Sequence, residues 1–154
     1  MTSFPTRFED VEVLEAFMCE PTPALVADLA RIEGDIIVLG VGGKMGPTLA
    51  RLARRAAPGR RVIGVARFSD PLVKAQLESH GVECFPCDLL DRQALQRLPN
   101  VADGVRNCVF MAGHKFGATG NASLTWMMNV GVPMMVADVF REMRIVTFST
   151  ACVY

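Results

Sequence analysis

Five short apolar runs, separated by stretches with helical patterning, constrain the fold of this chain more than any other feature. The runs are Ile36 to Leu39, Val62 to Val65, Val82 to Cys87, Val105 to Met111 and Ile145 to Phe148. Each run is nearly continuous, so we expect five strands buried on both faces; half-exposed antiparallel strands alternate polar and apolar residues instead. Parallel pairing with right-handed helical crossovers follows, and the sequence predicts a doubly wound α/β sheet.

Local signals mark where the intervening helices begin and end. The predicted starts are Pro47, Asp70-Pro71 and Asp91, and the predicted stops are Pro58-Gly59, Gly81 and Pro99. Within a longer helical stretch over residues 121–143, Pro133 should kink the helix or split it in two, because proline lacks the N–H that a helix interior needs.

Residues 9–20 and 22–33 have the pattern of two small helices, with Thr22 capping the second. We therefore divide the chain into a helical N-terminal arm, residues 1–34, and an α/β domain, residues 35–154. The arm is acidic, whereas the domain that follows carries the compensating positive charge.

Composition excludes several classes of protein. The 154 residues are 51% hydrophobic and balance 16 acidic against 16 basic side chains, which suits one soluble globular domain and gives no reason to expect a nucleic-acid partner. No apolar stretch approaches the roughly 18 residues that cross a bilayer, and no basic leader precedes an apolar core, so we expect a cytoplasmic protein with no membrane partner. Five cysteines, mostly in apolar runs, fit reduced core thiols.

The most informative motif is the turn after the first predicted strand, where Gly40, Gly43 and Gly46 recur at three-residue spacing before a helix. Gly40 allows a tight turn, Gly43 removes a side chain that would block a pyrophosphate, and Gly46 lets the helix approach the strand. Free N–H groups and the positive end of the helix dipole then face the anion. The motif predicts a dinucleotide site that includes Lys44 and Met45; a glycine-rich turn without a ligand is the alternative.

With this turn, the sequence resembles the extended branch of the short-chain dehydrogenase/reductase superfamily, the NAD-dependent epimerases and dehydratases, whose fingerprint is G-x-x-G-x-x-G. The resemblance runs from about residue 35 to the end of the sequence. It implies a Rossmann fold with strand order 3-2-1-4-5, NAD or NADP across the carboxyl ends of the strands, and a homodimer.

The end of the second strand bears on the choice of cofactor. Arg67 stands where an acid would accept hydrogen bonds from the NAD ribose, and a cation there can pair with the 2′-phosphate of NADP. We therefore favour NADP over NAD, although Asp70 is near enough to reach a ribose and Arg67 could be a solvated strand-end residue. After the third strand, Asp88 and Leu89 resemble the step that holds the adenine in this family, and Asp88 could also cap the turn.

The fourth strand leads into Ala112 and Gly113, which resemble the small residues that pass under the nicotinamide ribose and diphosphate in the family. His114 and Lys115 follow and either touch substrate or are solvated. Asn129 matches a cofactor-facing helix asparagine of the family, and could equally hydrogen-bond a neighbouring carbonyl.

The last segment resembles the fifth strand of extended members, in which a hydroxyl residue before a Val-Tyr pair binds the reacting oxygen. That residue maps to Thr150, with Ser149 as the alternative catalytic residue. Tyr154, the sole tyrosine, belongs to the Val-Tyr pair, and the family's Tyr-x-x-x-Lys motif is absent, so we interpret the chain as a fragment.

These observations favour the NAD(P)-binding domain of an epimerase, dehydratase or reductase that transfers a hydride at a secondary alcohol, with a sugar or sugar nucleotide as a candidate substrate. The alternative is a non-catalytic NAD(P) sensor. Cys84 and Cys87 have redox or zinc-like spacing but lack further ligands, so no metal is expected. Methionines cluster on the long helical region and indicate a buried or subunit-facing surface (Met127, Met128, Met134, Met135 and Met143).

Overall fold

The computed structural model describes residues 5–115 and 120–148. Within these ranges five parallel strands form one sheet in the order β3-β2-β1-β4-β5, as predicted. The strands are β1 (Asp35–Leu39), β2 (Val62–Ala66), β3 (Glu83–Pro86), β4 (Val105–Phe110) and β5 (Arg144–Thr147). This order places the change of winding direction between β1 and β4, where Rossmann folds bind their ligands.

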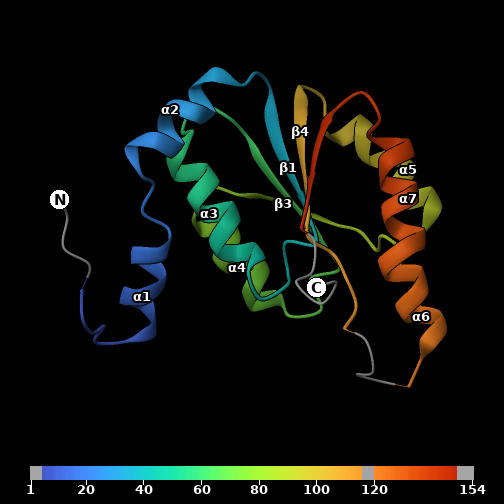
Figure 1. Cartoon of the computed structure of the whole chain (residues 1–154), viewed down its shortest axis with the longest axis horizontal. Coiled ribbons are helices and arrows are strands. Elements are labelled where there is room, and N and C mark those ends of the chain that lie inside the picture. Colours follow the sequence, from blue (N-terminus) through green and yellow to red (C-terminus); the bar gives the residue numbers. More distant parts are fainter. Residues whose placement is uncertain (1–4, 116–119, 149–154) are drawn as a thin grey trace, which may run out of the picture.

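Helices cover both faces of the sheet (Figure 1). They are α1 (Val11–Met18), α2 (Pro23–Arg31), α3 (Gly46–Ala56), α4 (Pro71–Ser79), α5 (Arg92–Val101), α6 (Ala122–Trp126), the π-helix η1 (Met127–Gly131) and α7 (Val132–Val139). One core cluster lies beneath α3 and α4 and contains Val38 and Leu77, while the other lies beneath α5 and α7 and contains Ile37 and Phe140. No helix in the described ranges has the length and apolar character to cross a bilayer.

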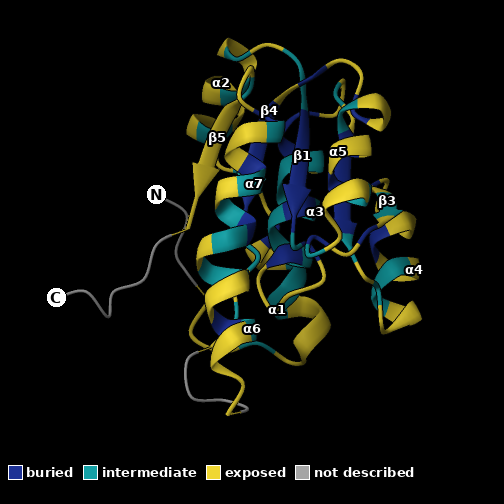
Figure 2. Ribbon diagram, turned by 90° about the vertical axis from the view of Figure 1, so that its right-hand side faces the viewer, coloured by how far each residue is buried: buried dark blue, intermediate teal, exposed yellow. Residues whose placement is uncertain are grey.

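The expectation that all five strands are buried on both faces is wrong for β3 and β5. The interior strands β1 and β2 are almost fully buried. Every residue of β5 is exposed, and β3 is exposed or half-buried (Figure 2). An outer strand has one neighbour in the sheet and receives less cover from the helix layers. Apolar composition alone does not distinguish a central strand from an outer one.

The predicted end of α5 at Pro99 is also wrong, because the helix continues to Val101. Proline costs a helix one hydrogen bond, but Leu95, Leu98 and Ala102 are all buried in the core that this helix covers. Burial of that apolar face outweighs the lost hydrogen bond so close to the end of the helix.

The long helical stretch is not split at Pro133, because α6, η1 and α7 follow one another with helical backbone angles at their junctions, but its hydrogen-bond pattern changes just before the proline. The turn before α7 widens into η1, and Pro133 lies in the first turn of α7, so the wider turn coincides with the residue that cannot donate a backbone hydrogen bond. The methionine cluster is divided: Met127 and Met134 are exposed, while the other three pack against the core (Met128, Met135 and Met143). The stretch therefore has one core face and one exposed apolar face.

The two predicted helices of the arm form and pack outside α3. Arg55 donates a hydrogen bond to the Ala16 carbonyl at 3.2 Å and pairs with Glu20, while the buried Cys19 thiol contacts the Thr48 carbonyl oxygen at 3.6 Å. These contacts hold the arm on the helix that begins at the glycine-rich turn.

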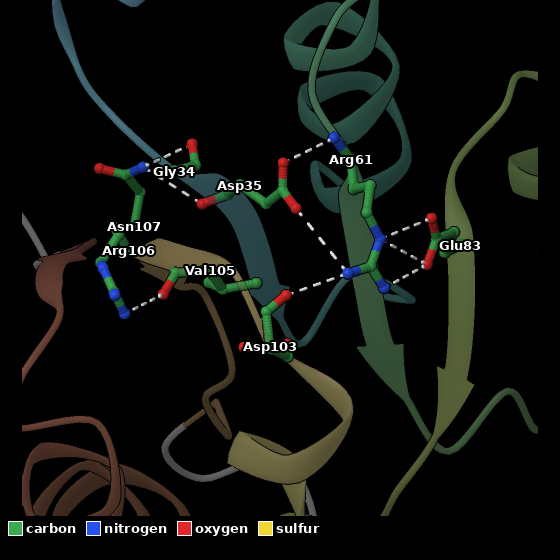
Figure 3. Close-up of polar contacts among 8 residues, drawn as sticks. All are labelled: Gly34, Asp35, Arg61, Glu83, Asp103, Val105, Arg106 and Asn107. Atoms are coloured by element: carbon green, nitrogen blue, oxygen red, sulfur yellow. Dashed lines mark hydrogen bonds and ion pairs between the residues drawn. The ribbon is translucent and has the colours of Figure 1, made fainter.

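Polar side chains close the amino edge of the sheet, which is the edge where its strands begin (Figure 3). The Arg61 guanidinium donates to both carboxylate oxygens of Glu83 at 2.8–3.2 Å and to the Asp103 carbonyl oxygen at 3.1 Å. The buried Asn107 amide nitrogen donates to three carbonyl oxygens, of Glu33, Gly34 and Asp35, at 2.9–3.2 Å. Both residues join the beginning of β1 to its neighbours.

Candidate cofactor site

A cleft of about 410 Å³ opens at the carboxyl edge of the sheet, where β1, β2, β3 and β4 end. Seven of the predicted cofactor-binding residues line it: Gly40, Gly43, Arg67, Asp88, Leu89, Ala112 and Gly113. The other four predicted residues lie outside its lining: Lys44, Met45, Gly46 and Asn129. Residues from four separate segments of the sequence therefore meet in one cavity, at the position that the strand order predicts.

The glycine-rich turn is tied directly to β2 and β4. Gly40 has φ +88°, and a Cβ atom there would lie 2.7 Å from the Ala112 backbone nitrogen. The backbone nitrogens of Gly40 and Val41 both donate to the Val65 carbonyl, at 2.8 and 3.1 Å. Gly40 is thus required by the protein's own backbone, because any side chain there would collide with Ala112 in the segment that follows β4.

Gly46 is required for a second internal contact. It is the first residue of α3, and a Cβ atom on it would lie 2.1 Å from the Val41 carbonyl oxygen. The sequence predicted close approach of helix and strand; the structure shows that the helix approaches the turn residue Val41, just beyond the strand. The beginning of α3 is therefore held against the turn.

Gly43 differs from the other two glycines of the motif. A Cβ atom there would meet only the Gly40 carbonyl oxygen, at an ordinary 3.4 Å, and its φ lies outside the left-handed region. Internal packing among the described residues therefore does not require glycine at this position. Gly43 nevertheless lines the cleft and is exposed, so the space in front of it is open to a ligand.

The beginning of α3 presents the positive end of its dipole beside this space, but Gly46 N–H already donates to the Gly43 carbonyl oxygen at 3.3 Å and Pro47 has no N–H. Met45 is its N-cap residue, and no side chain of the described chain caps the helix there. Lys44 and Met45 are exposed on the outer side of the turn. The dipole of α3 and the remaining N–H of its first turn are therefore available to an anion, as at the helix starts that bind a diphosphate.

The end of β2 provides the cation of the cleft. Arg67 is exposed and lines the cavity, and Phe68 after it has φ +50°, which is unusual for a residue other than glycine. Asp70 also lines the cavity, but one of its carboxylate oxygens accepts the Leu72 N–H at 2.9 Å as the N-cap of α4. The sequence identified Arg67 and Asp70 but carried no signal for the turn at Phe68.

The end of β3 contributes Asp88 and Leu89. The Asp88 carboxylate accepts the Leu90 N–H at 3.0 Å, so it caps the turn and also stands exposed at the cleft. The two roles predicted for Asp88 are therefore compatible. The Leu89 side chain is buried in the core, so the backbone of this residue is what a ligand can reach.

Cys84 and Cys87 are unsuited to act as a pair. Cys84 packs with the core cluster on one face of the sheet and Cys87 with the cluster on the other. Burial raises the pKa of both thiols, to about 11 for Cys84. No group of residues able to hold a metal ion occurs in the described ranges.

The loop after β4 forms the other end of the cleft. Asn129 accepts the His114 N–H at 2.8 Å and donates to the His114 carbonyl oxygen at 2.7 Å. Its amide group thus holds the backbone of this loop, which is the carbonyl-bonding role named as the alternative. Lys115 lies outside the cleft lining. Thr150, Ser149 and Tyr154 lie outside the described residues.

Several lining residues were missed by sequence reasoning. Gly42, Ser69, Cys87, Leu90 and Met111 each adjoin a predicted position, so the strand ends themselves were the available signal. Leu124 and Met128 come from α6 and η1 and have no local signal, because only the return of that helix toward β4 brings them to the cleft. The apolar side chains among them, such as Met111, Leu124 and Met128, supply walls for a ligand with planar rings.

The residues present fit a nicotinamide dinucleotide. The uncapped helix start and Gly43 suit its diphosphate, Arg67 and Asp88 provide polar groups on one side, and apolar walls lie on both sides.

Comparison with solved structures supports this fold. ADP-L-glycero-D-manno-heptose-6-epimerase from Helicobacter pylori is 19% identical with a TM-score of 0.69, over 79% of this chain and 40% of that chain. An epimerase from Methanothermobacter thermautotrophicus is 19% identical with a TM-score of 0.66, over 84% and 39%. L-threonine dehydrogenase from Clostridium difficile is 17% identical with a TM-score of 0.63, over 76% and 36%. This chain thus spans less than half the length of each.

Comparison with curated proteins gives no significant match. The sequence profile of the NAD dependent epimerase/dehydratase family, however, matches residues 36–154, which is most of the chain and all of its described strands except the first residue of β1. This chain therefore belongs to the NAD-dependent epimerase/dehydratase family.

Proposed function

We propose that the cleft binds a nicotinamide dinucleotide with its diphosphate over Gly43 at the start of α3. The adenosine half extends toward Arg67 and Asp88, and the nicotinamide half extends toward Ala112 and Gly113. The observation that carries this proposal is the position of Gly43. Internal packing does not require glycine there, and the residue lies beside a helix N-terminus that no side chain caps.

NADP is the preferred form in this proposal. Arg67 is the cation of the cleft lining at the end of β2, where the adenosine ribose lies in folds of this type. Asp70 is the opposing feature, because only one of its carboxylate oxygens caps α4 and the other can accept from an NAD ribose. A 2′-phosphate would nevertheless meet a free guanidinium group at this position.

The protein that contains this domain would transfer a hydride reversibly at a secondary alcohol, with a sugar nucleotide as substrate. Support comes from the family and from its epimerase neighbours of similar fold. The bound cofactor would supply the hydride chemistry, and Thr150, or Ser149 in its place, would orient the reacting oxygen. We place the protein in the cytoplasm as a homodimer, with the exposed apolar face of η1 and α7 at the subunit contact (Met127, Val130 and Met134).

Calorimetric titration of the purified chain with NADP and then NAD tests the cofactor assignment. We expect saturable binding at one site, with the tighter dissociation constant for NADP. Cooperative thermal unfolding in the same sample shows that the protein is folded. A folded chain that binds neither dinucleotide would overturn the proposal.

A further inference from the structure

His114 occupies a fixed place at the nicotinamide end of the proposed site. It lines the cleft and is half-buried, and Asn129 binds both its N–H and its carbonyl oxygen. The neighbouring lining residues carry no polar side-chain group apart from thioether sulfur (Met111, Ala112, Gly113, Leu124 and Met128). The imidazole is therefore the side chain through which this end of the cleft can recognise a hydrogen-bonding ligand.

The contacts of Thr125 fix which ring nitrogen of His114 carries the proton. Thr125 is buried, and its hydroxyl lies 3.1 Å from the Asn121 carbonyl oxygen and 3.1 Å from His114 Nδ1. Thr125 Oγ1 donates to the Asn121 carbonyl oxygen, which uses the single hydroxyl proton, so the contact with the imidazole is a hydrogen bond only if the hydroxyl oxygen accepts from Nδ1–H. In the neutral ring, Nε2 is then an acceptor without a partner among the described residues.

We propose that His114 Nε2 accepts a hydrogen bond from a sugar hydroxyl of the ligand in this cleft. The inference rests on the proposed dinucleotide site and assigns a recognition role to a residue beyond the glycine-rich turn. Two sources present the required O–H donor at this end of the site: the nicotinamide ribose and the hydroxyl of an alcohol substrate. Thr125 is the positioning residue, because it sets the proton on Nδ1.

Nitrogen NMR of the imidazole rings tests the proposal. The chain has two histidines, and His80 lies at the end of α4 and outside the cleft lining, so a His80→Gln variant assigns the spectrum. For the neutral ring of His114 without ligand, we expect a protonated Nδ1 and an unprotonated Nε2. Nicotinamide mononucleotide, NAD and NADP should each shift Nε2 if the donor is the cofactor ribose. A shift that appears only when UDP-glucose is added to the NAD-saturated chain would identify a substrate hydroxyl instead.

Two substitutions at Thr125 separate positioning from packing. Thr125→Val keeps the shape of the side chain but removes the hydroxyl, and should shift the neutral ring toward the Nε2–H tautomer. Thr125→Ser keeps the hydroxyl and should retain the native tautomer. His114→Ala should weaken binding of whichever ligand shifts Nε2 by about 3- to 10-fold, the range for one lost hydrogen bond, whereas His80→Ala should leave it unchanged.

The outcomes distinguish this proposal from the dinucleotide assignment. An Nε2–H tautomer in the free protein overturns it at once. Dinucleotide binding that shifts the amides of residues 40–46 but leaves Nε2 unchanged, also after UDP-glucose is added, overturns the role of His114 and leaves the cofactor site intact. Absence of any dinucleotide binding by the folded chain overturns both.

Discussion

The two edges of the sheet use polar residues in opposite ways. At the amino edge, the Arg61 guanidinium donates to Glu83 and to the Asp103 carbonyl oxygen. The Asn107 amide donates to three further backbone carbonyl oxygens. At the carboxyl edge, Arg67 has no protein partner within the described ranges, although it lines the cleft. The comparison indicates that one edge closes the fold while the other keeps hydrogen-bonding capacity for a ligand.

The glycines of the turn show the same division within a single motif. Gly40 and Gly46 are required by backbone atoms 2.7 and 2.1 Å from where a Cβ would lie, whereas a Cβ at Gly43 would have no protein atom nearer than the Gly40 carbonyl oxygen at 3.4 Å. Substitutions should therefore separate into those that lower stability and those that lower cofactor affinity.

The largest effect on stability should come from Gly46→Ala. Its Cβ would overlap the Val41 carbonyl oxygen, so the start of α3 must move, and we expect the free energy of unfolding to fall by about 3 kcal/mol. Urea denaturation measures this change. Gly59→Ala is the control, because no atom lies within 4 Å of its added Cβ; equal stability of the two variants would contradict the proposed packing role.

Gly43→Ala should leave the stability almost unchanged but lower the affinity for the cofactor. The added methyl group meets no close protein atom, so stability should change by less than about 0.5 kcal/mol. It lies in the space proposed for the diphosphate, and losing one or two hydrogen bonds to a charged group there should weaken binding of NADP and NAD about 10- to 100-fold. Calorimetric titration measures the affinity, and unchanged binding would place the diphosphate elsewhere.

Arg67→Gln tests whether one positive charge at the carboxyl edge selects NADP over NAD. We expect NADP affinity to fall about 10-fold, because the 2′-phosphate loses a charge-assisted hydrogen bond, while NAD affinity changes less than about 2-fold. Paired titrations give the ratio of the two dissociation constants. A parallel loss for both cofactors would show that Arg67 does not select the phosphate.

Arg61→Gln at the amino edge should lower the free energy of unfolding by about 1 kcal/mol, a modest change because the ion pair is solvent-exposed. Its distance from the cleft predicts unaltered NADP affinity. Chemical denaturation and titration of the same preparation test both parts, and a lost affinity with native stability would reverse the roles assigned to the two edges.

The smallest effect should be a pH dependence at Glu83. The hydrogen bond from Arg61 lowers the pKa of this carboxyl group, although desolvation opposes the shift. A depressed folded-state pKa contributes stability above the unfolded value of 4.5, and this contribution disappears as the pH falls through the folded value. As the pH falls below 4.5, the native chain should therefore lose more stability than Glu83→Gln, and the same pH dependence in both proteins would show that Glu83 makes no such contribution.

Much of this architecture could be predicted from sequence because its signals are local. The strand order followed from the resemblance carried by the glycine turn, and Pro133 marked the place where the long helix changes its hydrogen-bond pattern. The exposure of β5 could not be predicted, since apolar composition does not reveal how many neighbours a strand has. The two hydrogen bonds between the Asn129 side chain and the His114 backbone could not be predicted either, because they depend on the approach of η1 to the loop after β4.

The most direct test of the account is backbone amide NMR of the labelled chain during titration with NADP. We expect the largest shift changes in residues 40–46 and at Arg67, Asp88, Leu89, Ala112 and Gly113, with the amides of Arg61, Glu83 and Asn107 unchanged. Saturable changes centred on the amino edge, or none in the glycine turn of a folded protein, would contradict the assignment of the carboxyl edge as the ligand site.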